Sequence, residues 1–273
     1  IIHADGSIKN FKQADGLENE YIMAIYQDTN NIVWVGTDGD GIYLLKNEQI
    51  ISHITSDNGL AGNVIFKISQ DVDGAFWICS GSGITRCSGL DTKTGMPTSY
   101  ENINSENGIE TDSVFQILAD STNSVWMTSN HGISSVNYNE IIDVASGKTN
   151  KINVKFYNKN DGLDSNGPTS TAKSMIDKHG RIWFTMVDGI AIFDPIKIRE
   201  NPIMPLVQIE TISVDNVTLL DNTLFTNENV PITLKPGTKR VVITYTGLSF
   251  DSPERLTFTH KLTNFEDEFC TPT

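Results

Sequence analysis

Four polar residues occupy one repeated position in this chain, and their side chains are the ones best suited to contact a ligand. Each lies three residues after a Gly-Leu or Gly-Ile pair and just before a segment expected to be a strand. Carboxylates accept hydrogen bonds and carboxamides both accept and donate them, so the set suits a small polar ligand or an oligosaccharide. The alternative is that these side chains cap turns and contact water. The four residues are Glu20, Asn63, Asp112 and Asn166.

The usual motifs of catalysis and metal binding are missing from the sequence. The five histidines are scattered, and none has a metal-ligand spacing to a cysteine or carboxylate. There is neither a Gly-x-Ser-x-Gly elbow nor a His-Glu-x-x-His pair. The run from Gly36 to Gly41 carries Asp38 and Asp40, but it fits a turn better than a calcium loop. We therefore expect no catalytic residue, no metal, no cofactor and no enzymatic activity in this segment.

The bulk composition excludes two classes of partner. The chain has 273 residues and a formal net charge of −14, so a phosphate backbone or an anionic lipid surface would repel it. No apolar run approaches the roughly 20 residues of a membrane span, and no secretion signal is visible. The first residues look like the middle of a strand, so we expect an excised segment of a longer protein. Cys79 and Cys87 are expected to be buried free thiols, because their hairpin places Cys79 opposite Ile84 or Thr85.

A repeated unit must position the polar set, and its signature is Asp, two residues, Asn or Gly, two residues, then Trp. The pattern occurs four times and uses every Trp of the chain. Asn and Gly tolerate the positive φ angle of a tight hairpin, and the leading Asp can bond the amides of the turn. The Trp side chains are expected to pack between repeated units rather than to bind a ligand. They are Trp34, Trp77, Trp126 and Trp183.

The repeat predicts a β-propeller, because four strands per unit and a period above roughly 40 residues are typical of propeller blades. Residues 1–200 are expected to form this domain, as four repeats of four antiparallel strands. The blades are predicted at about 13–56, 57–104, 105–158 and 159–195. The third is expected to have an insertion at 139–150 and a last strand at 151–157. The fourth is expected to begin with a strand at 171–177 and to lack a fourth strand.

The second repeat resembles a known family. The residues that carry the resemblance are Asn58-Gly59-Leu60, Val64 to Asp71, Gly74 and Phe76-Trp77-Ile78. They resemble the two-component regulator propeller repeat, which builds the extracytoplasmic sensor of bacterial histidine kinases, including hybrid kinases. Related architectures place it before diguanylate cyclase modules. The fourth repeat departs from the pattern, because its loop from Asp161 to Thr171 is longer and carries Pro168.

Residues 201–273 are expected to form part of an immunoglobulin-like sandwich. Strands are predicted at 206–214 and 217–220 around the turn Asp215-Asn216, and further strands at 231–234, 240–246 and 256–262. The motif from Leu234 to Leu262 resembles the triple-tyrosine domain that follows such propellers. Phe258 and His260 stand where that family usually has tyrosines.

The resemblance implies a ligand-sensing region on the periplasmic or extracellular side of a bacterial inner membrane protein. The sensor would bind a polar ligand such as a glycan and could form a homodimer. It would reach the membrane only through a transmembrane segment that this chain lacks, and the kinase would lie beyond it. One alternative is the sensor region of a diguanylate cyclase. Another is a propeller lyase or glycosidase, for which Glu20 and Asp112 are the candidate carboxylates.

Closure of the ring has two alternatives. Residues 8–11 look like a fourth strand without its own blade, and they could pair with residues 189–194 to close a four-bladed ring. The chain could instead form an open arc of a larger propeller, which is the alternative we favour. An open arc should expose apolar side chains of the first strand, such as Ile22 and Ile25, and should tend to self-associate.

Overall fold

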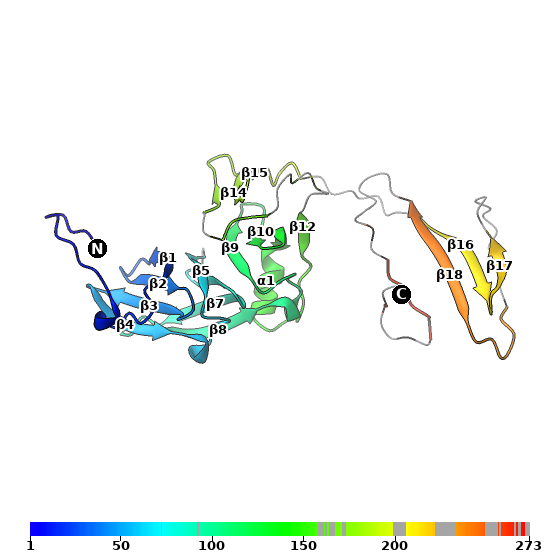
Figure 1. Ribbon diagram of the computed structural model, residues 1–273, viewed down its shortest axis with the longest axis horizontal. Helices are drawn as coiled ribbons and strands as arrows, with labels where there is room; N and C mark the ends of the chain where they lie inside the picture. The colour runs from blue at the N-terminus through cyan, green and yellow to red at the C-terminus, as the bar shows by residue number, and fades with distance from the viewer. Residues whose placement is uncertain are drawn as a thin grey trace. The chain divides into compact units, whose positions relative to one another are not determined.

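The computed structural model contains two compact units, Ile1–Ile198 and Arg199–Thr273. It describes residues 1–71, 73–91, 93–157, 161, 163, 167–170, 173–198, 206–221, 233–248, 256, 258–264, 266 and 269–270. The described secondary structure is almost entirely antiparallel strand (Figure 1). The all-β prediction is therefore confirmed.

The first unit contains three four-stranded sheets, each with its strands in chain order. Blade 1 comprises β1 (Ile22–Gln27), β2 (Val33–Thr37), β3 (Ile42–Lys46) and β4 (Gln49–Ile54). Blade 2 comprises β5 (Ile65–Gln70), β6 (Phe76–Ser80), β7 (Gly83–Leu90) and β8 (Pro97–Ile103). Blade 3 comprises β9 (Val114–Ala119), β10 (Ser124–Ser129), β11 (Gly132–Asn137) and β12 (Lys155–Tyr157).

Blade 4 has three strands among the described residues: β13 (Met175–Ile176), β14 (Ile182–Met186) and β15 (Gly189–Phe193). The strand predicted at 171–177 is thus much shorter. The strand predicted at 151–157 begins only at Lys155, because the preceding insertion contains the helix α1 (Tyr138–Ala145), which the sequence analysis did not predict. Ile141 and Val144 of α1 are buried in the core shared with blade 2.

The turns between the first two strands of each blade agree with the repeat pattern. Asn31, Gly74, Asn123 and Gly180 all have positive φ angles, between 58° and 88°. The second hairpin of blade 2 places Cys79 opposite Ile84, and both Cys79 and Cys87 are buried free thiols, as expected.

Consecutive blades bury their apolar faces against each other in what we call slots. Slot 1–2 contains Trp34 with Phe76 of the next blade, their rings stacked 4.3 Å apart. Slot 2–3 contains Trp77 and slot 3–4 contains Trp126. These three Trp side chains are at most 4% exposed. Trp183 of blade 4 is half-buried.

Residues 8–11 do not form the predicted strand. The segment makes an isolated bridge between Ile2 and Ile8, and the amide of Lys9 donates to the carbonyl of Ile1. No pairing to β15 occurs among the described residues. Ile22 and Ile25 are 38% and 66% exposed, so the exposure expected of an open arc is confirmed.

The second unit contains one described sheet with the order β17-β16-β18. The strands are β16 (Leu206–Val214), β17 (Val217–Asp221) and β18 (Val241–Leu248). The predicted turn Asp215-Asn216 joins the first two, and both of its residues have positive φ angles. The strand predicted at 231–234 lies largely outside the described residues. Described residues of the one predicted at 256–262 make only a bridge, from His260 to Cys270.

Candidate functional site

A compact turn precedes the first strand of each of the first three blades. It is a single 3-10 turn, at Gln13–Asp15, Ser56–Asn58 and Ser105–Asn107. The last side chain of each turn accepts the backbone N–H of the residue before the turn. The three distances are 3.0 Å from Lys12, 2.9 Å from Thr55 and 3.0 Å from Asn104. This cap fixes the start of the turn, because otherwise the amide before it would lack a partner.

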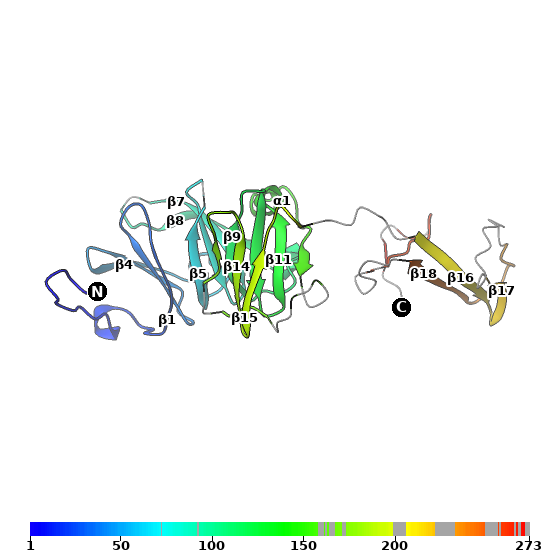
Figure 2. The ribbon, with the colours of Figure 1, turned by 90° about the horizontal axis from the view of Figure 1, so that it is seen from above.

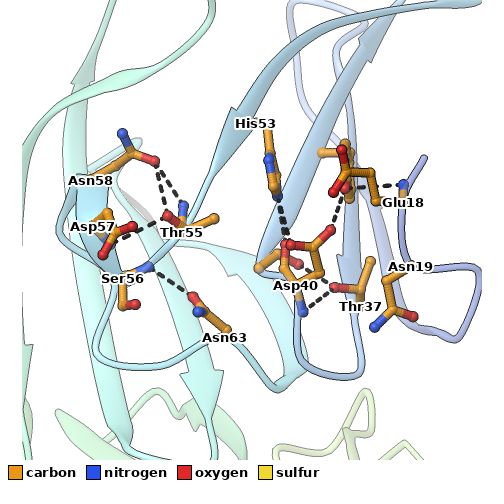
Figure 3. A network of polar contacts seen from close by, with 12 residues as sticks. Glu18, Asn19, Thr37, Asp40, His53, Thr55, Ser56, Asp57, Asn58 and Asn63 are labelled. Carbon is orange, nitrogen blue, oxygen red and sulfur yellow. Dashed lines mark hydrogen bonds and ion pairs between the residues drawn. The ribbon is translucent and has the colours of Figure 1, made fainter. Parts of the chain in front are cut away.

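Three of the four predicted ligand residues add a second cap to these turns. Glu20, Asn63 and Asp112 each accept the first backbone N–H of the turn seven residues earlier. The distances are 3.2 Å from Gln13, 2.7 Å from Ser56 and 2.7 Å from Ser105. Figure 3 shows this contact for Ser56 and Asn63. The fourth residue, Asn166, lies outside the described residues.

The cap uses one polar atom of each of these three side chains, and the second polar atom takes no part in it. Among the described residues, Glu20 Oε2, Asn63 Nδ2 and Asp112 Oδ2 have no hydrogen-bond partner. Glu20 is exposed, and Asn63 and Asp112 are half-buried. The structure therefore presents three oriented polar side chains at the same register of three consecutive blades.

The apolar residue of each Gly-Leu or Gly-Ile pair is buried, in slots 1–2, 2–3 and 3–4 for Leu60, Ile109 and Leu163 and on the outer face of blade 1 for Leu17. Leu17, Leu60, Ile109 and Leu163 are all at most 8% exposed. Gly59 has a φ of 125°, and a Cβ there would lie 2.8 Å from the Tyr100 ring. A glycine is required at that position because both the backbone conformation and the neighbouring ring exclude a side chain.

The loop between β2 and β3 joins the turns of blades 1 and 2. The carbonyl of Asn63 accepts the N–H groups of Gly39 and Gly41, at 3.2 Å and 2.9 Å. Asn19 Nδ2 donates to the carbonyl of Asp38 at 2.7 Å. The two Asp residues of this loop thus lie in a hydrogen-bonded turn, and the described residues contain no cluster of three or more potential metal ligands.

Asp40, Tyr43 and His53 form a polar cluster beside this loop. Figure 3 shows Asp40 and His53. The hydroxyl of Tyr43 donates to the Asp40 carboxylate and accepts the N–H of Glu18 at 3.2 Å. His53 Nε2 lies 2.6 Å from the carbonyl oxygen of Asp40, so it is the donor, and its ring stacks on Tyr43 at 4.1 Å. The sequence analysis missed this cluster, because only blade 1 has it.

The chemistry of this cluster is structural. Burial, together with the hydrogen bond to Asp40, raises the pKa of Tyr43 to about 12, so the hydroxyl stays protonated at neutral pH. Tyr43 is only 2% exposed and cannot reach a substrate. The contacts of Asp40 with Tyr43 and His53 hold the loop in place.

The Asp at the start of each repeat also bonds the Trp that ends it, a contact the sequence analysis missed. The second carboxylate oxygen accepts the indole N–H at 3.3, 2.8, 2.7 and 2.9 Å in blades 1 to 4. The constant six-residue spacing between Asp and Trp was the available signal. In blade 4, burial would raise the pKa of Asp177, but bonds from Trp183, His179 and Arg181 outweigh it and hold that pKa well below its usual range.

A family model supports the repeat assignment over a short stretch. The model described as "Two component regulator propeller" matches residues 16–39, which include the first polar residue and the first Trp. No curated protein matches the chain. Among the described residues, no helix is both long enough and apolar enough to cross a bilayer.

Solved structures resemble this chain to different degrees, and the one with a TM-score of 0.66 shares its fold. One is the extracellular domain of a protein described as a hybrid two component system from B. thetaiotaomicron, with 18% identity and a TM-score of 0.66, covering 97% of this chain and 34% of that one. A second such domain from the same organism has 16% identity and a TM-score of 0.37, and the match covers 93% of this chain and 38% of that one. Virginiamycin B lyase from Staphylococcus aureus has 15% identity and a TM-score of 0.40, and the match covers 68% of this chain and 59% of that one. The chain thus spans about a third of the first structure.

Proposed function

We propose that this chain is part of the extracytoplasmic sensor region of a bacterial two-component system, and that it binds a polar ligand such as a glycan. The observation that carries the proposal is the row of Glu20, Asn63 and Asp112, held at one register by the same backbone contact in three blades. The family model over residues 16–39 supports the assignment to a two-component regulator.

The geometry suits binding because the three side chains are already oriented. Each is fixed by the cap that it makes, so little conformational entropy is lost when its remaining polar atom meets a ligand. The row combines two carboxylates and one carboxamide, which favours a ligand with several hydroxyl groups. Asn166 would extend the row to the fourth blade.

The same proposal includes the rest of the sensor. Residues 201–273 would form a triple-tyrosine domain that relays binding toward a histidine kinase on the other side of the membrane. The region would lie in the periplasm or outside the cell. The extracellular domain with a TM-score of 0.66 supports that location through its fold.

Catalysis is not part of the proposal. Glu20 and Asp112 lie on different blades, and one oxygen of each is already bonded to a backbone amide. A glycosidase needs two carboxyl groups within roughly 10 Å across one bond, of which one is free to donate a proton. Ligand binding needs no free acid, so it is compatible with the hydrogen bonds that Glu20 and Asp112 already make.

A thermal-shift screen tests the function. A panel of neutral and acidic oligosaccharides is added to the chain, and a ligand is expected to raise its melting temperature further as the ligand concentration rises above the dissociation constant. Release of a shortened product from any oligosaccharide would overturn the non-catalytic part. Absence of any shift across the panel would overturn glycan binding.

Conservative variants test whether a ligand found in this screen binds at the row of Glu20, Asn63 and Asp112. Asn63→Asp and Asp112→Asn keep the capping oxygen but change the second polar atom, so they should lose the ligand-induced shift and keep the fold. Asp57→Asn is the matched control, because Asp57 is exposed on the same turn as Ser56 and makes no cap with its side chain. An equal shift in all three variants would contradict ligand contact at this row.

A further inference from the structure

The first strands of successive blades lie side by side and form what we call the inner wall. β5 lies between β1 and β9 in both views (Figure 1 and Figure 2). The rings of Phe66 on β5 and Phe115 on β9 meet edge to face at 5.1 Å. The amide of Ser174, next to β13, donates to Gln116 Oε1 at 2.7 Å and connects the first strand of blade 4 to β9. Side chains at one level of this wall can therefore contact the same bound group.

One level of the inner wall carries two lysines and a glutamine. The level is the position on each first strand that pairs two residues after the Trp of the second strand. In blades 1 to 3 it is occupied by Ala24, Lys67 and Gln116. Continuing the register of β13 and β14 back by two residues places Lys173 there in blade 4. Blades 2, 3 and 4 thus present Lys, Gln and Lys at one level.

Lys67 is a half-buried cation that has no acid partner among the described residues. Its cross-strand neighbour Cys79 is neutral at neutral pH, because burial raises the pKa of that thiol to about 12. Burial lowers the pKa of Lys67, and the nearby charge of Lys173 lowers it further. The two ammonium groups are therefore close enough to repel each other, although the chain as a whole has a net charge of −14. An anion between them would pair both charges and remove the repulsion.

Two buried hydroxyl groups adjoin Gln116 and have no hydrogen-bond partner in the described part of the chain. They are Thr128 Oγ1, across the strand pair from Gln116, and Ser174 Oγ. Thr128 and Ser174 are 1% and 4% exposed. The equivalent residues in slot 1–2 are Gly36 and Ile68, which carry no polar side chain. A buried hydroxyl without a partner is costly, so an anion at this level, or a water bound to it, would satisfy both donors.

We propose that Lys67 and Lys173 bind an anionic group, a carboxylate or a sulfate, on the inner wall at the level of Gln116. The two ammonium groups donate to its oxygens from blades 2 and 4. The hydroxyls of Thr128 and Ser174 donate to it directly or through water. The site is separate from the row of Glu20, Asn63 and Asp112, whose two carboxylates would repel an anion.

The anionic group can belong to a free ion or to an acidic sugar. Lys67 follows Asn63 by four residues, and four residues of strand span about 13 Å. An acidic oligosaccharide can therefore place hydroxyl groups on the row and its carboxylate on the two lysines. This extension rests on the proposed function, whereas binding of a free anion does not.

A sulfate titration tests the anion site itself. The melting temperature of the chain is measured with increasing sodium sulfate at constant ionic strength, and a saturable rise is expected. Lys67→Met and Lys173→Met should retain only the gradual stabilisation that sulfate gives to proteins generally. Lys178→Met is the matched control, because Lys178 is exposed in the turn between β13 and β14, and it should keep the saturable rise. A gradual effect alone in the natural chain, or the same rise in all four proteins, would overturn the proposal.

Calorimetry with two oligosaccharides distinguishes the sources of the anionic group. A galacturonic acid oligomer is compared with a neutral galactose oligomer of the same length. The acidic oligomer should bind more tightly, and its affinity should fall at least about tenfold in both Lys67→Met and Asn63→Asp. Equal affinity for the two oligomers would overturn the acidic-sugar extension and leave glycan sensing intact. Sulfate binding without binding of either oligomer would support the anion site and contradict the proposed function.

Discussion

The carboxylate of Asp71 accepts two hydrogen bonds from different parts of the fold. The indole N–H of Trp77, in the same hairpin, donates at 2.8 Å, and the hydroxyl of Tyr138, at the start of α1, donates at 2.7 Å. One side chain thus connects the Trp of blade 2 to the helix that blade 3 inserts. The Asp–Trp bond recurs in all four blades, but the bond to a helix occurs where the insertion is present.

Tyr138→Phe should destabilise the first unit, because it removes a donor to a charged acceptor. Burial, followed by the bond to Asp71, raises the pKa of Tyr138 to about 12, so the hydroxyl donates throughout the neutral range. A bond of this kind contributes about 1.5–3 kcal/mol. Urea unfolding measures the loss, and Tyr21→Phe is the control because Tyr21 is 77% exposed. Equal losses in both variants would show that the contact contributes nothing.

Trp→Ala substitutions should have unequal effects. Trp34, Trp77 and Trp126 are enclosed in slots, so removing each ring should cost about 3–5 kcal/mol of unfolding free energy. Trp183 is half-buried, so Trp183→Ala should cost clearly less in the monomer. Denaturant unfolding of the four variants provides the comparison. A uniform loss would contradict the assignment of Trp183 to an open face.

The thiols should differ sharply in reactivity. Burial raises the pKa of both Cys79 and Cys87 to about 12, and both are inaccessible in the core. Cys270 is exposed. A thiol reagent at pH 8 should label one cysteine in the folded chain and three after denaturation. Rapid labelling in the folded chain would mean that a slot opens in solution, slot 2–3 if Cys79 is labelled and slot 1–2 if Cys87 is labelled.

Asp177 should contribute to acid sensitivity. Folding lowers its pKa, so the ionised side chain stabilises the fold above the pKa of a free aspartate, about 4, and this contribution is lost as the pH falls through the folded value. The stability difference between the natural chain and Asp177→Asn should therefore shrink between pH 5 and pH 2. Unfolding curves at both pH values measure it, and a constant difference would refute the linkage.

The sequence was sufficient to predict the first three strands of blades 1 to 3, because the repeat constrains them redundantly. Each blade has an Asp at the start of its first turn, an Asn or Gly at positive φ and a Trp on its second strand, so the three signals support one another. In blade 2, for example, the repeat predicts strands at 64–71 and 75–80, and these agree with β5 and β6 to within one residue at each end.

The missed features lack such repetition. The helix α1 has eight residues, too few to be stable alone, and it depends on burying Ile141 and Val144 against blade 2. Asn137 caps its first turn and was the available signal, but nothing in the sequence shows the surface it packs on. The cluster of Asp40, Tyr43 and His53 comes from neighbouring strands of blade 1 only, so spacing alone could not bring it together.

Calorimetric titration of one ligand into matched variants tests the sensor assignment most directly. The best oligosaccharide from the thermal-shift panel is titrated into the natural chain, Asn63→Asp and Asp57→Asn at pH 7. Saturable binding to the natural chain and to Asp57→Asn is predicted, with affinity reduced at least about tenfold in Asn63→Asp, equivalent to about 1.4 kcal/mol. Binding of equal affinity in all three proteins would contradict a ligand site at the row of Glu20, Asn63 and Asp112.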